Sequence, residues 1–537
     1  MNNEKEIPLK KGEIEKRIWG HRLYDDQTGM LTLLEFLCVL RSKSFESQNK
    51  DPSKKPDKNT CFLSSYGVPK RTLLRSLVFN NPYVNEKKYD NPWNDWKELF
   101  INDEQNKDVD SGNGDKDDGQ KHQLARLDDL ENLKKIFAMQ GLTENQSFDN
   151  FSEVINLLSS SGINVGTNRR WTSKFLFPWG KNCLYLEVDD KGKAGDRRFF
   201  ARNGELLYLM LSFAEKREKL EELINEKLLN SNNDFDKIAR ALSLGDETDH
   251  PVQGSLESGC VVPVDFFEYS RRRINIICED LIQLFSLPIP LPDIVVHSSR
   301  MIMLNLYCYF LEQARSVITH FDSNEAIHPG GMLLCEAVQR QTNGIRECSK
   351  KFFSLDSALS CSALRIYYKN NAVDSSRNKE IEEIDYDSDG EVDGDSKSLD
   401  ENSNKDDSID EILNNHRKHW GANLVRSFGK DCGLVSKLYT NAFRYAPSDA
   451  LLQSLAAVLI PKKRLLLNDF LTIIHERYGL VYDKTEFNKV KVTHEDLIPN
   501  PGELVENRRR LHTRLESLGL LVSLSDGFDF ILNPCKR

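Results

Sequence analysis

The spacing of apolar residues along the chain predicts a protein built mostly of helices. Met30–Arg41 has the pattern of a buried helix near the N-terminus. Farther along, the helical period predicts helices at Leu206–Leu229, Phe235–Leu244, Phe266–Phe285 and Ser298–Ile318, the last almost wholly apolar in its first half. Between the last two, Leu287–Pro292 is expected to be a rigid extended connector, because proline fixes the backbone.

Few segments show the alternation typical of strands. In the central part of the chain, Cys183–Val188 predicts a strand that leads into a turn at Asp189–Gly192, as in a small β-hairpin. The fold class expected from these patterns is mostly α with minor β, in several domains.

The last 90 residues have the most informative order of elements. Asp449–Ile460, Leu465–Tyr478 and Glu503–Leu518 are predicted helices, and Leu520–Leu524 and Phe528–Leu532 are predicted strands around an Asp-Gly turn. Helices followed by a two-stranded wing are typical of a winged helix, and the phrase RLESLGLLVSLSDGFDFILNP resembles the end of many such domains. Winged helices bind DNA, but they also serve as protein-interaction and spacer modules.

Charge divides the chain into segments. The whole chain of 537 residues has a net charge of −10, yet residues 380–411 alone hold fifteen acidic residues and two lysines, and residues 102–120 hold seven and two. Both runs are nearly free of large apolar groups and are expected to be disordered linkers. The predicted organisation is an N-terminal α-rich domain (1–101), an acidic linker (102–120), a central mostly α domain (121–379), an acidic linker (380–411) and a C-terminal winged-helix domain (412–537).

Several classes of protein are disfavoured by what the sequence lacks. No apolar run reaches the 18–20 residues that span a bilayer, and no signal peptide is evident, so we expect a cytoplasmic protein without a membrane partner. The eleven cysteines form no C-x-x-C pair and are expected to be buried thiols. Walker, nucleophile-elbow and H-E-x-x-H motifs are absent, so no cofactor and no catalytic residue is expected. A metal-dependent nuclease with a loose signature in the central domain stays open.

The third predicted helix of the C-terminal domain offers the main candidate binding residues. On a helical wheel, Leu504, Leu511, Leu515 and Leu518 share the core-facing stripe. The opposite face and its flank carry the residues expected to meet double-stranded DNA, together with a basic run after the first helix: Arg509, Arg510, Thr513, Arg514, Lys462, Lys463 and Arg464. His512, at the edge of the stripe, is expected to be structural.

A second basic and aromatic patch lies in the central domain. Arginines beside aromatic residues can hold phosphates or stack on bases, but they also lie over hydrophobic surfaces in ordinary folds. The residues concerned are Arg169, Arg170, Trp171, Arg197, Arg198 and Arg202. Nearer the N-terminus, Trp19 is expected to be a packing anchor, with His21 and Arg22 as its polar neighbours rather than an anion site.

Two acidic runs resemble calcium loops in spacing. Asp385, Asp387, Asp389 and Asp393 follow the alternating pattern of such a loop, but Ser396 stands where a bidentate glutamate should close the coordination shell. The run Asp108–Asp115 has the same deficiency. No metal site is therefore expected.

Three fragments together carry a resemblance to a known group of proteins. They are WGHRLYDDQTGMLTLLEFLCVL near the N-terminus, DRRFFARNGELLYLML in the centre, and the winged ending. The chain resembles uncharacterised accessory subunits of bacterial anti-phage defence systems, such as Druantia subunits that lack enzymatic motifs. The resemblance implies a non-catalytic component working in a complex beside a helicase or nuclease, and it assigns no role to any residue.

The functional expectation is a DNA-associated scaffold or adaptor of an antiviral defence system. It depends on the basic C-terminal domain and on the missing catalytic motifs. Two alternatives remain: a protein-interaction adaptor that does not contact DNA, and the metal-dependent nuclease.

Overall fold

The computed structural model describes residues 13–536, except for 58–59, 64, 87–88, 100–129, 139–141, 166–172, 187–199, 244–248, 254–258, 322–330, 339–342, 372–419, 491, 493–494 and 526. Both expected linkers and both calcium-loop-like runs lie outside the described residues. The described chain is mostly helical with minor β structure, as the sequence predicts.

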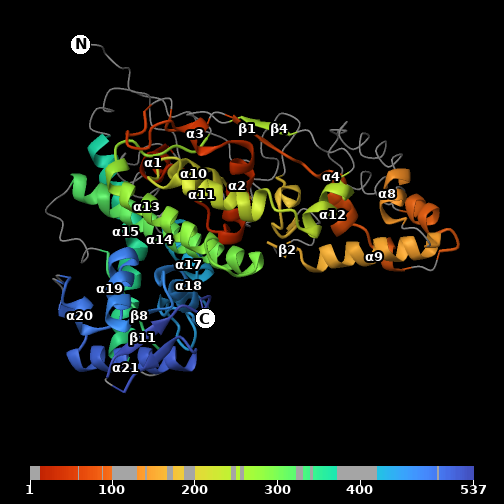
Figure 1. Cartoon of the computed structure of the whole chain (residues 1–537). Coiled ribbons are helices and arrows are strands. Elements are labelled where there is room, and N and C mark those ends of the chain that lie inside the picture. Colours follow the sequence, from red (N-terminus) through yellow and green to blue (C-terminus); the bar gives the residue numbers. More distant parts are fainter. Residues whose placement is uncertain are drawn as a thin grey trace, which may run out of the picture.

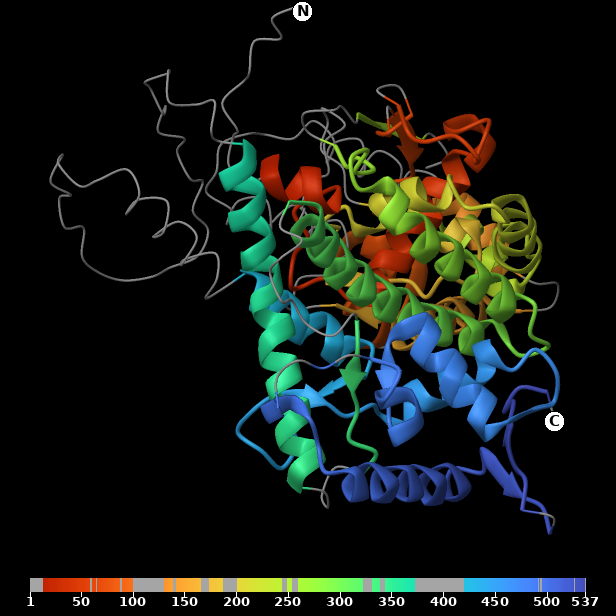
Figure 2. The same ribbon diagram turned by 90° about the vertical axis from the view of Figure 1, so that its left-hand side faces the viewer.

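A long central helix organises the body of the molecule. This helix, α14 (Leu291–Phe321), packs against α13 (Phe267–Phe285), α15 (Asn343–Asn371), α2 (Gly29–Ser42) and α17 (Ala422–Asp431). Figure 2 shows α15 running along one side of the helical body, down to the C-terminal elements. By length and composition α14 could span a membrane, but 78% of its most apolar window is buried inside the structure, as in a core helix.

A network of polar side chains lies inside this core. Asn305, in the apolar half of α14, donates to a carboxylate oxygen of Asp280 on α13 at 2.8 Å and accepts from Arg273 at 2.9 Å. Asp280 also accepts from Arg477 of α19 (Leu467–Tyr478) at 2.6 Å. Because each buried charge has a partner, the network avoids the cost of an unpaired charge and fixes how the helices cross.

The N-terminal segment packs into the same body. Helix α2 lies between α14 and α10 (Asn203–Leu211), with α1 (Glu13–Trp19) and α3 (Phe45–Gln48) beside them. Trp19 is fully buried, with its ring 5.1 Å from Phe310 and 5.2 Å from Trp420, which confirms that it is a packing anchor. Buried side chains from all three expected domains form a continuous core among the described residues, and the domain boundaries stay predictions.

A second group of helices extends to one side, as Figure 1 shows. Trp93, Trp96, Phe148 and Phe151 pack there in edge-to-face and tilted pairs, with ring centroids 5.0–6.3 Å apart. The elements concerned are α4 (Thr72–Phe79), α5 (Tyr83–Glu86), α8 (Leu130–Phe137), α9 (Glu144–Ser160), α12 (Asp234–Leu242), the short strands β2 (Ile163–Asn164) and β3 (Lys174–Phe175), and the turn η3 (Lys181–Cys183). The antiparallel pair β1 (Ser65–Val68) and β4 (His250–Gln253) lies nearby.

Several predicted elements differ from the structure. The helix expected over 206–229 is interrupted: α10 ends at Leu211, α11 (Arg217–Ile224) begins after a break, and η4 (Asn225–Leu229) follows. Two hydrogen bonds stabilise the chain at this break. The side-chain oxygen of Asn275 on α13 accepts from the amide of Glu215, and Arg217 donates to the carbonyl of Ser212.

The prediction of a strand over 183–188 was also wrong for residues 183–186, the part that the structure describes. Leu184–Leu186 pair with no strand, and they are buried on both sides, so their apolar run came from burial rather than from a sheet. The turn expected at Asp189–Gly192 lies outside the described residues. The connector before α14 is shorter than predicted, because the helix begins at Leu291 and Pro292 fits in the first turn, where its missing N–H needs no partner.

The C-terminal elements sit below the helical body in Figures 1 and 2. After α17 come β6 (Val435–Ser436), β7 (Arg444–Tyr445), α18 (Asp449–Leu459), β8 (Arg464–Leu466), α19, β9 (Leu480–Val481), α20 (Lys484–Phe487), η7 (Glu495–Leu497), α21 (Pro501–Ser517), β10 (Leu521–Ser523) and β11 (Asp529–Leu532). Strand β9 pairs in parallel with β5 (Leu333–Leu334), which attaches this part to the body. Residues 449–533 are called the C-terminal unit below.

A small antiparallel sheet closes the C-terminal unit. Its strand order is β10, β11, β8. The hairpin predicted after Gly519 is confirmed, because β10 pairs with β11 from Leu521–Ile531 to Ser523–Asp529. The third strand was missed: residues 464–466, assigned in part to the following helix, pair with β11 instead.

Candidate functional site

Helix α21 lies along the outer edge of the molecule, with the body above it in both views (Figures 1 and 2). Three members of the predicted core stripe, Leu504, Leu511 and Leu515, are buried, as expected. The fourth, Leu518, follows the helix and is only half-buried against the same core. Buried Asn507 lies on the same side and donates to the carbonyl oxygens of Cys335 and Tyr482. The opposite side of the helix therefore faces outward, as the wheel predicts.

Two of the candidate arginines on this outer side share one carboxylate. Arg509, with 68% of its side chain exposed, donates to both oxygens of Glu506 at 2.8 Å. Arg510, only 18% exposed, donates to one of them at 2.8 Å. These bonds lower the pKa of Glu506 to about 2, so it stays negatively charged and cancels one of the two positive charges.

The flanking arginines are held within the protein. Arg514, 15% exposed, donates to Asp449 of α18 and to the carbonyl oxygen of Ala337, both at 2.8 Å. Arg508 donates to Asp483 at 2.8 Å. Both side chains join α21 to neighbouring elements, and each positive charge is balanced by a carboxylate.

The remaining polar residues of α21 have local roles. Thr513 is exposed and its hydroxyl bonds the carbonyl of Arg509 one turn earlier. His512 contacts Ser523 and Asp529 at 3.2 Å, so it joins the helix to the hairpin. This placement agrees with the structural role expected for His512.

The basic run at 462–464 is exposed and stands apart from these pairs. Lys462 and Lys463 have no ion-pair partner within the described chain. The guanidinium of Arg464 lies 4.5 Å from the ring centre of Phe530. We call these three residues the basic turn.

The sheet of β8, β10 and β11 has an apolar surface that was not predicted from the sequence. Residues directly opposite each other in an antiparallel sheet point to the same side, and the register places Val522, Phe530 and Leu466 in one row across the three strands. The neighbouring row, Leu521, Ile531 and Leu465, faces the core, where Ile531 is fully buried. The first row is therefore on the outer side.

Exposure confirms which side of the sheet is open. Val522 is 43% exposed and Phe528 is 55% exposed, and the amide of Leu524 donates to the carbonyl of Phe528, which extends the ladder toward the hairpin tip. We call Leu466, Val522, Leu524, Phe528 and Phe530 the outer sheet face. The signal was present in the sequence: both sides of the predicted hairpin are apolar, where a solvated side should be polar.

The central basic and aromatic patch is mostly outside the described residues. This holds for Arg169, Arg170, Trp171, Arg197 and Arg198. Arg202 is described and is buried, bonded to Glu205 of α10 at 3.3 Å. Its guanidinium supports the start of that helix and is not at the surface to meet a phosphate.

The described residues contain no group of three or more His, Cys, Asp or Glu side chains placed to hold a metal ion. The eleven cysteines are free thiols, nine of them buried. No family model, curated protein or solved structure matches the chain.

Proposed function

We propose that the chain is a non-catalytic adaptor, that its C-terminal unit is a winged-helix module, and that this module docks a partner protein through the outer sheet face. The succession of α18, β8, α19, α21, β10 and β11 supports the winged-helix assignment, because β8 joins the hairpin in one sheet. The short elements β9, α20 and η7 lie between α19 and α21. The apolar outer sheet face carries the proposal, because its members Val522, Leu524 and Phe528 are exposed and apolar side chains that gather on one surface are typical of protein interfaces.

The surface also suggests the chemistry of the partner. The apolar centre of the outer sheet face is bordered by the basic turn, whose lysines are exposed. A matching partner presents apolar side chains at its centre and carboxylates at its rim, as complementary interfaces do. Such an interface depends mainly on apolar burial and is therefore only weakly sensitive to salt.

The face of α21 is less suited to a polyanion than the sequence indicated. Arg508 and Arg514 are balanced by Asp483 and Asp449, and Arg509 and Arg510 share Glu506. A duplex would have to compete with carboxylates already in contact with these guanidinium groups. This neutralisation favours the protein-docking function over the DNA-contact function.

The test is co-purification with proteins encoded by the neighbouring genes. Val522→Asp with Phe528→Asp places two charges in the apolar centre without touching the core, and we expect the partner's affinity to fall at least about tenfold. Val296→Asp, on an equally exposed valine of α14, is the matched control and should retain the partner. Equal retention by both variants, or no partner for the wild-type chain, would contradict the proposal.

Contact with double-stranded DNA is the second candidate function. It is favoured by exposed Arg509 and by the basic turn, where two lysines lack an ion-pair partner in the described part of the chain. Arg509→Glu with Arg510→Glu should then abolish duplex binding and flatten its salt dependence. Unchanged retention on DNA would count against this candidate.

The wider setting of the proposal is antiviral defence in the cytoplasm. The resemblance of the three fragments supports an accessory subunit of an anti-phage system, and a helicase or nuclease of that system is then the expected partner. Deleting the gene should lower resistance to phage, and a variant with a disrupted outer sheet face should fail to restore it.

A further inference from the structure

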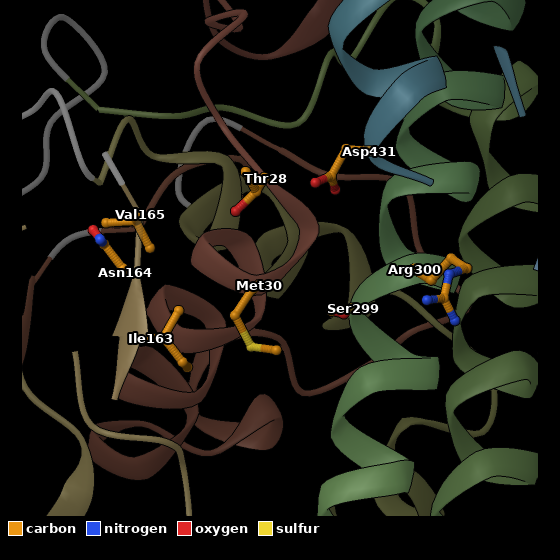
Figure 3. A pocket seen from close by; sticks show the side chains of 8 residues that line it. All are labelled: Thr28, Met30, Ile163, Asn164, Val165, Ser299, Arg300 and Asp431. Atoms are coloured by element: carbon orange, nitrogen blue, oxygen red, sulfur yellow. The ribbon is translucent and has the colours of Figure 1, made fainter. Parts of the chain in front are cut away.

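A cavity of about 290 Å³ lies where segments far apart in the sequence meet, and no residue of the outer sheet face lines it. Figure 3 shows its lining, which includes Met30, Ile163, Ser299, Arg300 and Asp431. The start of α2 lies close against α14 here, since a Cβ on Gly29 would be only 2.0 Å from the carbonyl oxygen of Ser299. The cavity is about ten water volumes in size, the lower end of the range for small-molecule sites.

One wall carries a cation with unused donors. Arg300 donates from one terminal nitrogen to the hydroxyl of Ser454 on α18, at 2.9 Å. Partial burial lowers the pKa of Arg300, but a guanidinium remains charged at any physiological pH. Its other nitrogens have no hydrogen-bond partner among the described residues and remain available to a ligand.

Another wall carries an anion with an unused acceptor. Asp431, the last residue of α17, accepts from the amide of Gly29 at 2.7 Å through one carboxylate oxygen. Desolvation raises the pKa of Asp431, while the Gly29 amide and the Arg300 charge lower it. The second oxygen accepts no hydrogen bond from the residues that the structure describes.

The two opposite charges influence each other across the cavity without meeting. Each affects the pKa of the other, yet no ion pair within 4 Å joins Arg300 to Asp431. Each is already anchored by a separate bond, to Ser454 and to Gly29, so neither has to move to meet a ligand. Fixed opposite charges separated by a small cavity are preorganised for a molecule that carries both complementary charges.

We propose that this cavity binds a free α-amino acid with an apolar side chain. Asp431 accepts from its ammonium group, and Arg300 donates to its carboxylate. Figure 3 places Met30 and Ile163 on the side of the cavity opposite Arg300, where they would contact the ligand's side chain. An amino acid supplies both charges within a few bond lengths, which matches a cavity of this size better than a longer dipolar molecule.

Calorimetric titration of the purified full chain tests the proposal. The probes are L-leucine and L-methionine, with isopentylamine and 4-methylpentanoate as analogues that keep one charge each. We expect saturable binding of the amino acids and at least about tenfold weaker binding of each analogue, because each loses one charge-assisted contact. Equal binding of an analogue, or no binding of either amino acid, would overturn the proposal.

A second test uses variants that remove one charge from the cavity and keep the local hydrogen bonds. Asp431→Asn retains an oxygen for the Gly29 amide and removes the charge, and Arg300→Gln retains a donor for Ser454. Each should weaken L-leucine binding by about tenfold or more. Lys430→Gln, whose native ammonium lies over Phe443, is the control and should bind like the wild type. Wild-type affinity in both charge variants, with circular dichroism showing an intact fold, would contradict the site even if amino acids bind elsewhere.

Discussion

Val522 on β10 lies directly opposite Phe530 on β11, and both side chains point away from the core. The same register places Leu466 beside Phe530, so the apolar row runs across all three strands. A sheet that is apolar on both sides usually has one side covered by a second protein or by a further layer of the same chain. This relationship, and not the arginines of α21, is the basis of the proposed docking function.

Stability should depend on pH through a buried pair of glutamates. Burial, and then the nearby charge of Glu205, raise the pKa of Glu35 from 4.5 to about 8. The folded state therefore holds a proton that the unfolded state releases between these values, so the free energy of unfolding should fall as pH rises from about 4.5 to 8. Removing the Glu205 charge lowers the pKa of Glu35, and Glu205→Gln should reduce this slope.

Urea unfolding at several pH values measures the slope. One unit less difference between the folded and unfolded pKa corresponds to about 1.4 kcal/mol less change in stability across the window. Glu222→Gln, an exposed change on α11, should leave the slope as it is. A Glu205→Gln protein with the wild-type slope would show that the charge of Glu205 does not raise the pKa of Glu35.

A buried ion cluster should make a single glutamate essential for stability. Glu336 is fully buried and accepts from Arg444, also fully buried, and from Arg346 at 2.9 Å. Glu336→Ala leaves the Arg444 charge buried and unpaired, which should cost about 3–5 kcal/mol in the free energy of unfolding. The exposed pair Glu347–Lys350 is a matched comparison, and Glu347→Ala should cost less than about 1 kcal/mol. Similar midpoints in urea for the two variants would show that the cluster is not effectively buried.

The contact between α2 and α10 should tolerate no added methyl group. A Cβ on Gly204 would lie 2.4 Å from the amide nitrogen of Phe36 and 2.7 Å from the carbonyl oxygen of Thr32, and neither backbone atom can rotate aside. Gly204→Ala should therefore lower the free energy of unfolding by about 1–3 kcal/mol or more. Gly502→Ala, where the nearest atom is 3.4 Å away, should stay within about 0.5 kcal/mol of the wild type. Thermal unfolding followed by circular dichroism compares the two, and equal midpoints would refute the close approach.

The sequence predicted those elements whose formation depends on local pattern. The periods of α2, α13, α18 and α21 were sufficient because each of these helices has an apolar side that must be buried. The hairpin after Gly519 was predicted for the same reason. Elements set by distant contacts were not: β8 exists because residues 464–466 meet β11 some 65 residues later, and no local signal marks that pairing.

The sequence predicted which residues of the candidate site face outward, but not that carboxylates balance the charges of its arginines. The wheel correctly placed Arg509 and Thr513 outside and Leu511 inside. It could not show that Arg514 reaches Asp449 of α18, because that contact depends on how two helices pack. Net charge counted along a helix therefore overestimated the positive charge that the surface presents.

Site-specific photocrosslinking tests the docking proposal most directly. A photoreactive phenylalanine analogue is placed at Val522, at Arg509 or at Val296 in the full chain, and crosslinks are formed in the native cell. If a partner protein docks on the outer sheet face, one protein encoded by a neighbouring gene is captured from position 522 and not from position 296. Failure to capture any protein from position 522, with DNA captured from position 509 instead, would contradict it.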